Sequence, residues 1–129
     1  MDDVEILLVE DNDEDAELAL RALKRHNLTA HLHRVTDGAA ALDFFFKAGA
    51  PPPTPRVVLL DLKLPKVDGM EVLRELKGRA ETRSVPVVML TSAKEERDVT
   101  EAYRLGVNSY VVKPVDFEAF VRAVEVVGR

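Results

Sequence analysis

The chain has 129 residues, the length of one domain with a sizeable core, and we expect residues 1–129 to form a single domain. It contains no cysteine, which excludes disulfides and thiol chemistry, and no apolar run approaches the roughly 20 residues that span a bilayer. The net charge of −5 argues against direct nucleic-acid binding, and the acidic Met-Asp-Asp start against a secretory signal, so we expect a cytoplasmic protein without nucleic-acid or membrane partners.

The chain opens with an apolar run followed by an acidic helical pattern. The run Ile6–Val9 predicts a short buried strand. Residues 13–26 carry apolar side chains at helical spacing, with Asn12 or Asp13 as the N-cap. The acids at 13–15 suit the positive end of this helix, and the helix dipole is a sufficient reason for them.

The middle of the chain continues the alternation. Residues 32–35 form a more polar run, which predicts a strand at the edge of a sheet. Residues 38–48 predict a second helix, whose three consecutive phenylalanines cannot all face inward. The proline-rich stretch 49–55 predicts a loop, and 57–60 predicts another buried strand. A third helix starts near 68–69.

The last third of the chain adds two more strands and two more helices. Residues 87–90 and 110–112 are apolar runs that predict strands. Residues 94–105 predict a fourth helix, with Gly106 as its C-terminal cap. Residues 116–127 predict a fifth helix.

This order of elements predicts an α/β fold: an open five-stranded parallel sheet with helices on both faces. Because the most polar strand is the second, we favour the flavodoxin-like strand order 2-1-3-4-5, which puts that strand at an edge, over a Rossmann-type order. In such sheets, sites form outside the carboxyl ends of the strands, near the point where the strand order reverses.

Polar side chains follow four of the predicted strands. Glu10 and Asp11 follow the first strand, Asp61 the third, Thr91 the fourth and Lys113 the fifth. Two carboxylates about 4 Å apart repel each other by roughly 4 kcal/mol at an effective dielectric near 20, so three of them in one crevice call for a cation. Oxygen donors favour a hard metal, and Mg²⁺ suits a site shared with a phosphoryl group.

The same side chains indicate phosphoryl chemistry. Asp61 can act as a nucleophile and form an aspartyl-phosphate, while Lys113 and the Thr91 hydroxyl can each hold a phosphoryl oxygen. Taken singly, an aspartate after a strand is often a turn residue and a lysine is often a surface residue. Together, each at the end of its own strand, they are a strong signal.

Four motifs carry these residues. The runs are Leu8-Val9-Glu10-Asp11-Asn12, Leu59-Leu60-Asp61-Leu62-Lys63-Leu64-Pro65 with Asp68-Gly69, Val88-Met89-Leu90-Thr91-Ser92-Ala93, and Tyr110-Val111-Val112-Lys113-Pro114. In this order, and over essentially the whole chain, they resemble the receiver domains of two-component response regulators. The Glu-Asp-Asn opening, the Asp-Leu-Lys-Leu-Pro run and the Lys-Pro-Val-Asp run most resemble small stand-alone regulators paired with phytochrome-type histidine kinases.

The resemblance implies a role for each residue. Glu10 stands where many receivers have aspartate. Lys63 stands where this branch often has asparagine, so we expect a rate of autodephosphorylation that differs from that of Lys63→Asn. The Lys113–Pro114 peptide is expected to be cis. The implied catalytic residues are Asp61, the phosphoacceptor, with Thr91 and Lys113. The implied ligands of Mg²⁺, or of Mn²⁺, are Glu10, Asp11, Asp61 and the backbone carbonyl of Lys63. The implied switch pair is Thr91 and Tyr110.

The resemblance also implies a signalling function rather than a dedicated enzyme. A histidine kinase, of phytochrome type in this branch, would supply the phosphoryl group, and the domain would catalyse its own phosphorylation and slow autodephosphorylation. The signal would pass to a downstream protein through the fourth helix, fifth strand and fifth helix, where a homodimer is also expected. Because the chain ends after the fifth helix, we expect output through partners. Aromatic residues in or near this surface are Tyr103, Tyr110, Phe117 and Phe120.

Other functions fit the sequence less well. A receiver-like interaction module that is never phosphorylated would have no need of Asp61, Thr91 and Lys113. A flavodoxin-type electron carrier would need a phosphate-binding loop where the acidic residues 10–13 stand. A phosphatase with an Asp-x-Asp strand end lacks its second acid, because Lys63 stands there. A Rossmann dehydrogenase would need a Gly-x-Gly-x-x-Gly motif, which is absent.

Overall fold

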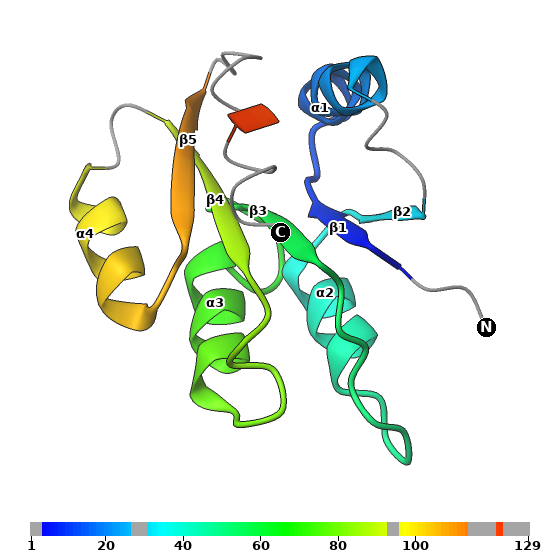
Figure 1. Ribbon diagram of the computed structural model, residues 1–129. Coiled ribbons are helices and arrows are strands. Elements are labelled where there is room, and N and C mark those ends of the chain that lie inside the picture. Colours follow the sequence, from blue (N-terminus) through cyan, green and yellow to red (C-terminus); the bar gives the residue numbers. More distant parts are fainter. Residues whose placement is uncertain (1–3, 27–30, 93–95, 114–120, 123–129) are drawn as a thin grey trace.

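A computed structural model describes residues 4–26, 31–92, 96–113 and 121–122 (Figure 1). They form a parallel sheet in the order β2-β1-β3-β4-β5, which confirms the predicted fold class and strand order. The strands are β1 (Ile6–Val9), β2 (Leu32–Val35), β3 (Val57–Asp61), β4 (Val87–Ser92) and β5 (Ser109–Lys113). The helices are α1 (Asp13–Arg25), α2 (Gly38–Phe45), α3 (Gly69–Gly78) and α4 (Glu96–Leu105).

The core lies on both faces of the sheet because successive strand side chains point to opposite sides. In β1, Leu7 and Val9 face one apolar cluster, while Ile6 and Leu8 face the other. Helix α1 covers the second cluster, on the opposite side of the sheet from α2 and α3 (Figure 1). The first cluster includes Phe45 of α2, Leu73 of α3 and Ala102 of α4.

Strand β2 lies at an edge, as its polar sequence predicts. Among the described strands it pairs with β1 alone, and none of its side chains is fully buried. The inner strands β1 and β3 are buried along their whole length, in agreement with their continuous apolar runs.

Two helix ends carry the caps that the sequence predicts. Asn12, rather than Asp13, caps α1, since its side-chain oxygen accepts a hydrogen bond from the Asp15 N–H at 2.9 Å. Gly106 ends α4 with φ of 106°, as expected for a C-terminal cap, and the Val107 N–H donates to the Ala102 carbonyl at 3.0 Å. Within the described ranges, no helix is long and apolar enough to cross a membrane.

Helix α2 ends at Phe45, earlier than the predicted residue 48. Phe46 leaves the helical conformation, and its ring centroid lies 3.9 Å from the guanidinium carbon of Arg79, the residue that follows α3. Sequence periodicity does not reveal this contact, because it involves a second helix. Phe45 is buried and its two aromatic neighbours are partly exposed, so the three rings divide as expected. The predicted fifth helix (116–127) lies outside the described residues except for 121–122, which are helical. Pro114 also lies outside them, so the predicted cis Lys113–Pro114 peptide stays a prediction.

Candidate phosphoacceptor site

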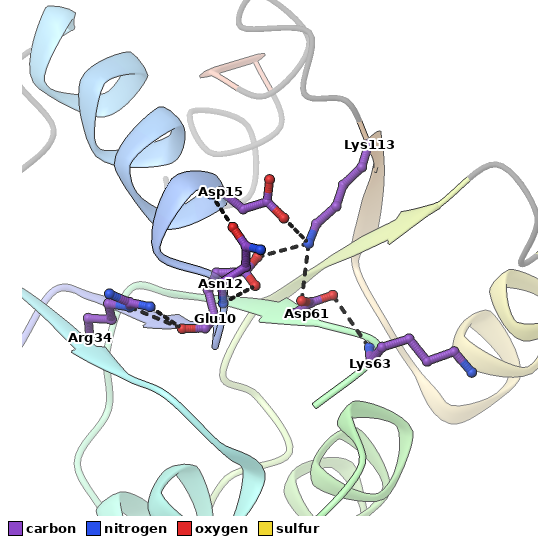
Figure 2. Close-up of polar contacts among 7 residues, drawn as sticks. All are labelled: Glu10, Asn12, Asp15, Arg34, Asp61, Lys63 and Lys113. Atoms are coloured by element: carbon purple, nitrogen blue, oxygen red, sulfur yellow. Dashed lines mark hydrogen bonds and ion pairs between the residues drawn. The ribbon is translucent and has the colours of Figure 1, made fainter. Parts of the chain in front are cut away.

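The carboxyl ends of β1, β3 and β5 meet at one edge of the sheet, and Lys113 joins them (Figure 2). Its ammonium nitrogen lies 2.9 Å from Glu10 Oε1 and 3.1 Å from Asp61 Oδ2. These residues are more than 50 positions apart in the sequence, so the contacts depend on the predicted strand order. The structure therefore brings the predicted acids and the predicted lysine into one group.

Three carboxylates form a compact acidic cluster at this edge. One oxygen from each of Glu10, Asp11 and Asp61 lies within 4.8 Å of the others. Glu10 is 1% exposed and Asp61 is 6% exposed, whereas Asp11 is open to solvent. An all-oxygen donor set with one open side fits a hard divalent cation such as Mg²⁺ or Mn²⁺, which keeps part of its water shell.

The tip of β1 is held from the neighbouring edge strand. The Arg34 guanidinium on β2 donates two hydrogen bonds to the Glu10 backbone carbonyl, at 3.0 and 2.8 Å, and forms an ion pair with Asp13 at 3.0 Å. The Asn12 backbone N–H donates to Glu10 Oε2 at 3.2 Å. Contacts within the protein thus fix both the backbone and the side chain of Glu10.

Asp61 occupies the last position of β3, and a seven-residue loop, 62–68, connects it to α3. The Lys63 N–H donates to Asp61 Oδ1 at 3.4 Å, and the Lys63 side chain is exposed. The first residue of α3, Gly69, lies directly against the end of β3. A side chain at Gly69 would overlap the carbonyl oxygens of Asp61 and Leu62. Glycine is therefore needed at this position for the close approach.

The two predicted switch residues lie on adjacent strands in different environments. Thr91 on β4 is 1% exposed and directly follows Leu90, the register partner of Asp61. Tyr110 on β5 is 40% exposed and stacks edge-to-face on Tyr103 of α4, with ring centroids 5.9 Å apart. Tyr110 therefore points outward in this structure. Phe117 and Phe120 lie outside the described residues.

The sequence matches the family model of the response regulator receiver domain over residues 6–125. The chain belongs to this family. The receiver domain is 52% identical to the bacteriophytochrome response regulator RtBRR, with a TM-score of 0.84, covering 96% of this chain and 77% of RtBRR. The coverage includes all four motifs that indicated the family from the sequence.

Two further relatives have solved structures, one with bound Mn²⁺ and one phosphorylated. Rcp1 of Synechocystis sp. is 39% identical over 122 residues, or 93% of this chain and 83% of Rcp1. Its Mn²⁺-bound form superposes with a TM-score of 0.76 at 37% identity, covering 94% and 89% of the two chains. The phosphorylated form of the cyanobacterial phytochrome response regulator RcpA gives a TM-score of 0.77 at 32% identity, covering 96% and 91%.

Sequence reasoning missed the partners of two acids in the first turn of α1 of this receiver domain. Asp15 Oδ2 lies 3.0 Å from the Lys113 ammonium, so the helix dipole is not a sufficient reason for the acids at 13–15. Asp13, in the same run, pairs with Arg34. No linear signal marks these pairs, because they depend on how the first turn of α1 lies over the strand tips.

The raised pKa of Glu10 would make a metal site that includes this carboxylate sensitive to pH. This pKa is raised from 4.5 to about 7: burial is the largest cause, the neighbouring Asp61 contributes to the rise, and the hydrogen bond from Lys113 opposes it. The carboxyl therefore takes up a proton as the pH falls through about 7, and a protonated carboxyl is a poor metal ligand. Mg²⁺ affinity should fall by up to about tenfold between roughly pH 7.5 and pH 6, measured by calorimetric titration.

Glu10→Gln is the control for this prediction. It has the same shape and no titratable group, so its weaker Mg²⁺ affinity should vary little over the same pH interval. Equal affinities of the wild-type protein at both pH values would show that Glu10 does not compete with protons for the metal.

Proposed function

We propose that this receiver domain accepts a phosphoryl group on Asp61 from a histidine kinase and passes the signal to a partner protein. One observation carries the proposal. At the carboxyl ends of the strands, Asp61 Oδ2 lies 3.1 Å from the Lys113 ammonium nitrogen, and Asp61 forms an acidic cluster with Glu10 and Asp11. The similarity to bacteriophytochrome and cyanobacterial phytochrome response regulators supports a phytochrome-type kinase as the donor.

In the proposed transfer, an Asp61 carboxylate oxygen attacks the phosphorus of a phosphohistidine. A new O–P bond forms as the N–P bond breaks, and the leaving imidazole nitrogen keeps the electron pair and takes up a proton from solvent. Glu10, Asp11, Asp61 and the Lys63 backbone carbonyl would hold a divalent cation, which neutralises charge on the phosphoryl oxygens when bound.

Lys113 would supply a permanent positive charge during the transfer. Burial alone would lower its pKa, but hydrogen bonds to Glu10 and Asp15 and the charge of Asp61 outweigh burial and raise the pKa above its ordinary value. The ammonium is thus charged throughout the physiological pH range. It can exchange its bond to Asp61 for one to a phosphoryl oxygen without a proton transfer.

The proposed output is a shift between two arrangements of Thr91 and Tyr110. A phosphoryl group on Asp61 would attract the buried Thr91 hydroxyl, and the Tyr110 ring would then leave its exposed position against Tyr103 and turn inward. The surface of α4 and β5 would change shape and become the contact for a downstream protein or for a second copy of the chain.

The test of the proposed function is phosphorylation by a small-molecule donor. Incubation with acetyl phosphate and Mg²⁺, followed by intact-mass measurement, should show a gain of one phosphoryl group, and chelation of the metal should prevent it. No adduct from acetyl phosphate or from a phosphorylated histidine kinase would instead favour an interaction module that is never phosphorylated.

Lys63 is expected to lengthen the life of the phosphoryl group. Its exposed ammonium lies two residues after Asp61, where it can attract phosphoryl oxygens and hinder the approach of water. Lys63→Asn should therefore speed loss of the phosphoryl group by about 2–5-fold, followed by mass measurement after donor removal. Lys47→Asn, an exposed lysine near the end of α2, is the control. Equal half-lives for Lys63→Asn and the wild type would refute this role.

A further inference from the structure

Glu10, Asn12, Asp15 and Lys113 form a closed ring of hydrogen bonds around the tip of β1 (Figure 2). The Asn12 N–H donates to Glu10, the Asn12 side chain accepts from the Asp15 N–H, and Lys113 donates to both Asp15 and Glu10. We infer that Asp15 is a positioning residue that keeps the Lys113 ammonium at the phosphoacceptor during transfer. The inference rests on the proposed function.

The ammonium of Lys113 has three donor hydrogens, and three carboxylates surround it. Its distances are 2.9 Å to Glu10, 3.0 Å to Asp15 and 3.1 Å to Asp61. Two of these partners have other tasks in the proposed reaction, since Glu10 belongs to the acidic cluster and Asp61 receives the phosphoryl group. Asp15 is outside that cluster, so it is the partner that can keep its bond to Lys113 throughout.

Asp15 is well placed for this task because its own backbone is fixed. It lies in the first turn of α1, where the Asn12 cap bonds its N–H at 2.9 Å. Its side chain is 36% exposed, whereas that of Lys113 is 20% exposed. The helix therefore provides a rigid anchor for a lysine whose four-carbon stem is otherwise flexible.

The anchor also explains a distinction among the first-turn acids of α1. Glu14 is exposed, and Asp13 is 92% exposed and paired with Arg34 at the outer side of the turn. All three acids favour the helix N-terminus through its dipole, but Asp15 alone among them contacts Lys113. Removing Asp15 and removing Glu14 should thus have equal effects on the helix and unequal effects on phosphorylation.

The test compares phosphorylation rates at saturating acetyl phosphate and Mg²⁺, measured by intact mass. Asp15→Ala should lower the rate by about 5–10-fold, the size expected when a charge-assisted hydrogen bond that orients a catalytic group is lost. Asp15→Asn keeps a hydrogen-bond acceptor and should lose less. Glu14→Ala should react at the wild-type rate.

A double-mutant cycle separates positioning of Lys113 from a general effect on the fold or the electrostatic field. If Asp15 acts through Lys113, then adding Asp15→Ala to Lys113→Ala should cause no further decrease in rate. A wild-type rate for Asp15→Ala, or the same fold-decrease in both backgrounds, would overturn the inference while leaving the proposed function intact. No adduct on the wild-type protein would overturn both.

Discussion

Asp61→Asn should prevent phosphorylation of this protein by acetyl phosphate completely. Asparagine has the same shape as aspartate, and its amide oxygen can still accept the hydrogen bond that the Lys63 N–H donates at 3.4 Å. The amide is not a nucleophile toward phosphorus under these conditions, so the reaction loses the atom that forms the new bond. The expected result is the unmodified mass after an incubation that converts the wild-type protein to its phosphorylated form.

The fold should tolerate this substitution. Asp61 is 6% exposed and lies close to Glu10 and Asp11. Removing its negative charge reduces the repulsion among these three side chains. Circular dichroism should therefore show an unchanged spectrum. Asp43→Asn, an exposed acid on α2, should be phosphorylated like the wild type. An adduct of wild-type yield and lifetime on Asp61→Asn would show that another carboxylate accepts the phosphoryl group.

Lys113→Ala should lower both stability and reactivity, and Mg²⁺ should restore only the stability. Once the Lys113 ammonium is removed, Glu10 and Asp61 are two nearly buried acids that lie next to each other without its positive charge. Removing one partner from a buried charged group lowers the free energy of unfolding by about 3–5 kcal/mol where the remaining groups stay charged. For Lys113→Ala we expect a smaller loss of about 2–3 kcal/mol, because Glu10, whose pKa is already raised to about 7, can take up a proton.

The metal separates these two consequences. Mg²⁺ replaces the missing positive charge among the acids, so it should bind the variant more tightly than the wild type and recover most of the lost free energy of unfolding. It does not replace the ammonium at the phosphoryl oxygen, so the phosphorylation rate at saturating Mg²⁺ should stay about 100-fold low.

Urea unfolding with and without Mg²⁺ measures the first consequence of Lys113→Ala, and intact mass measures the second. Lys24→Ala, an exposed lysine in the last turn of α1, is the control and should change neither quantity appreciably. Equal free energies of unfolding for Lys113→Ala and the wild type in the absence of metal would show that the lysine does not stabilise the acidic cluster.

The sequence was sufficient to predict the fold and the convergence of the site, for identifiable physical reasons. Continuous apolar runs mark strands buried on both faces, and the polar run at β2 marks the edge, which together give the strand order. The strand order alone predicts that Glu10, Asp61 and Lys113 lie together at the carboxyl ends of the strands, even before the side-chain positions are known. Family motifs then supply the roles that these residues are expected to have.

Contacts between elements were beyond the reach of sequence patterns. The bonds from Arg34 to the Glu10 carbonyl and from Asp15 to Lys113 depend on the orientation of α1 and β2 around the strand tips. The outward position of Tyr110 depends on the Tyr103 ring of another element. Sequence periodicity describes one element at a time, so it assigns such residues to a surface without naming their partners.

Diffraction from crystals of the protein grown with Mn²⁺ is the decisive experiment for the metal site beside Asp61, because the anomalous signal of the ion locates it independently of any chemical assumption. One strong anomalous peak is expected at the carboxyl ends of the strands, within bonding distance of the proposed ligand oxygens of Glu10, Asp11, Asp61 and Lys63. A peak elsewhere on the protein, or none with Lys113 still bonded to Glu10, Asp15 and Asp61, would contradict this expectation.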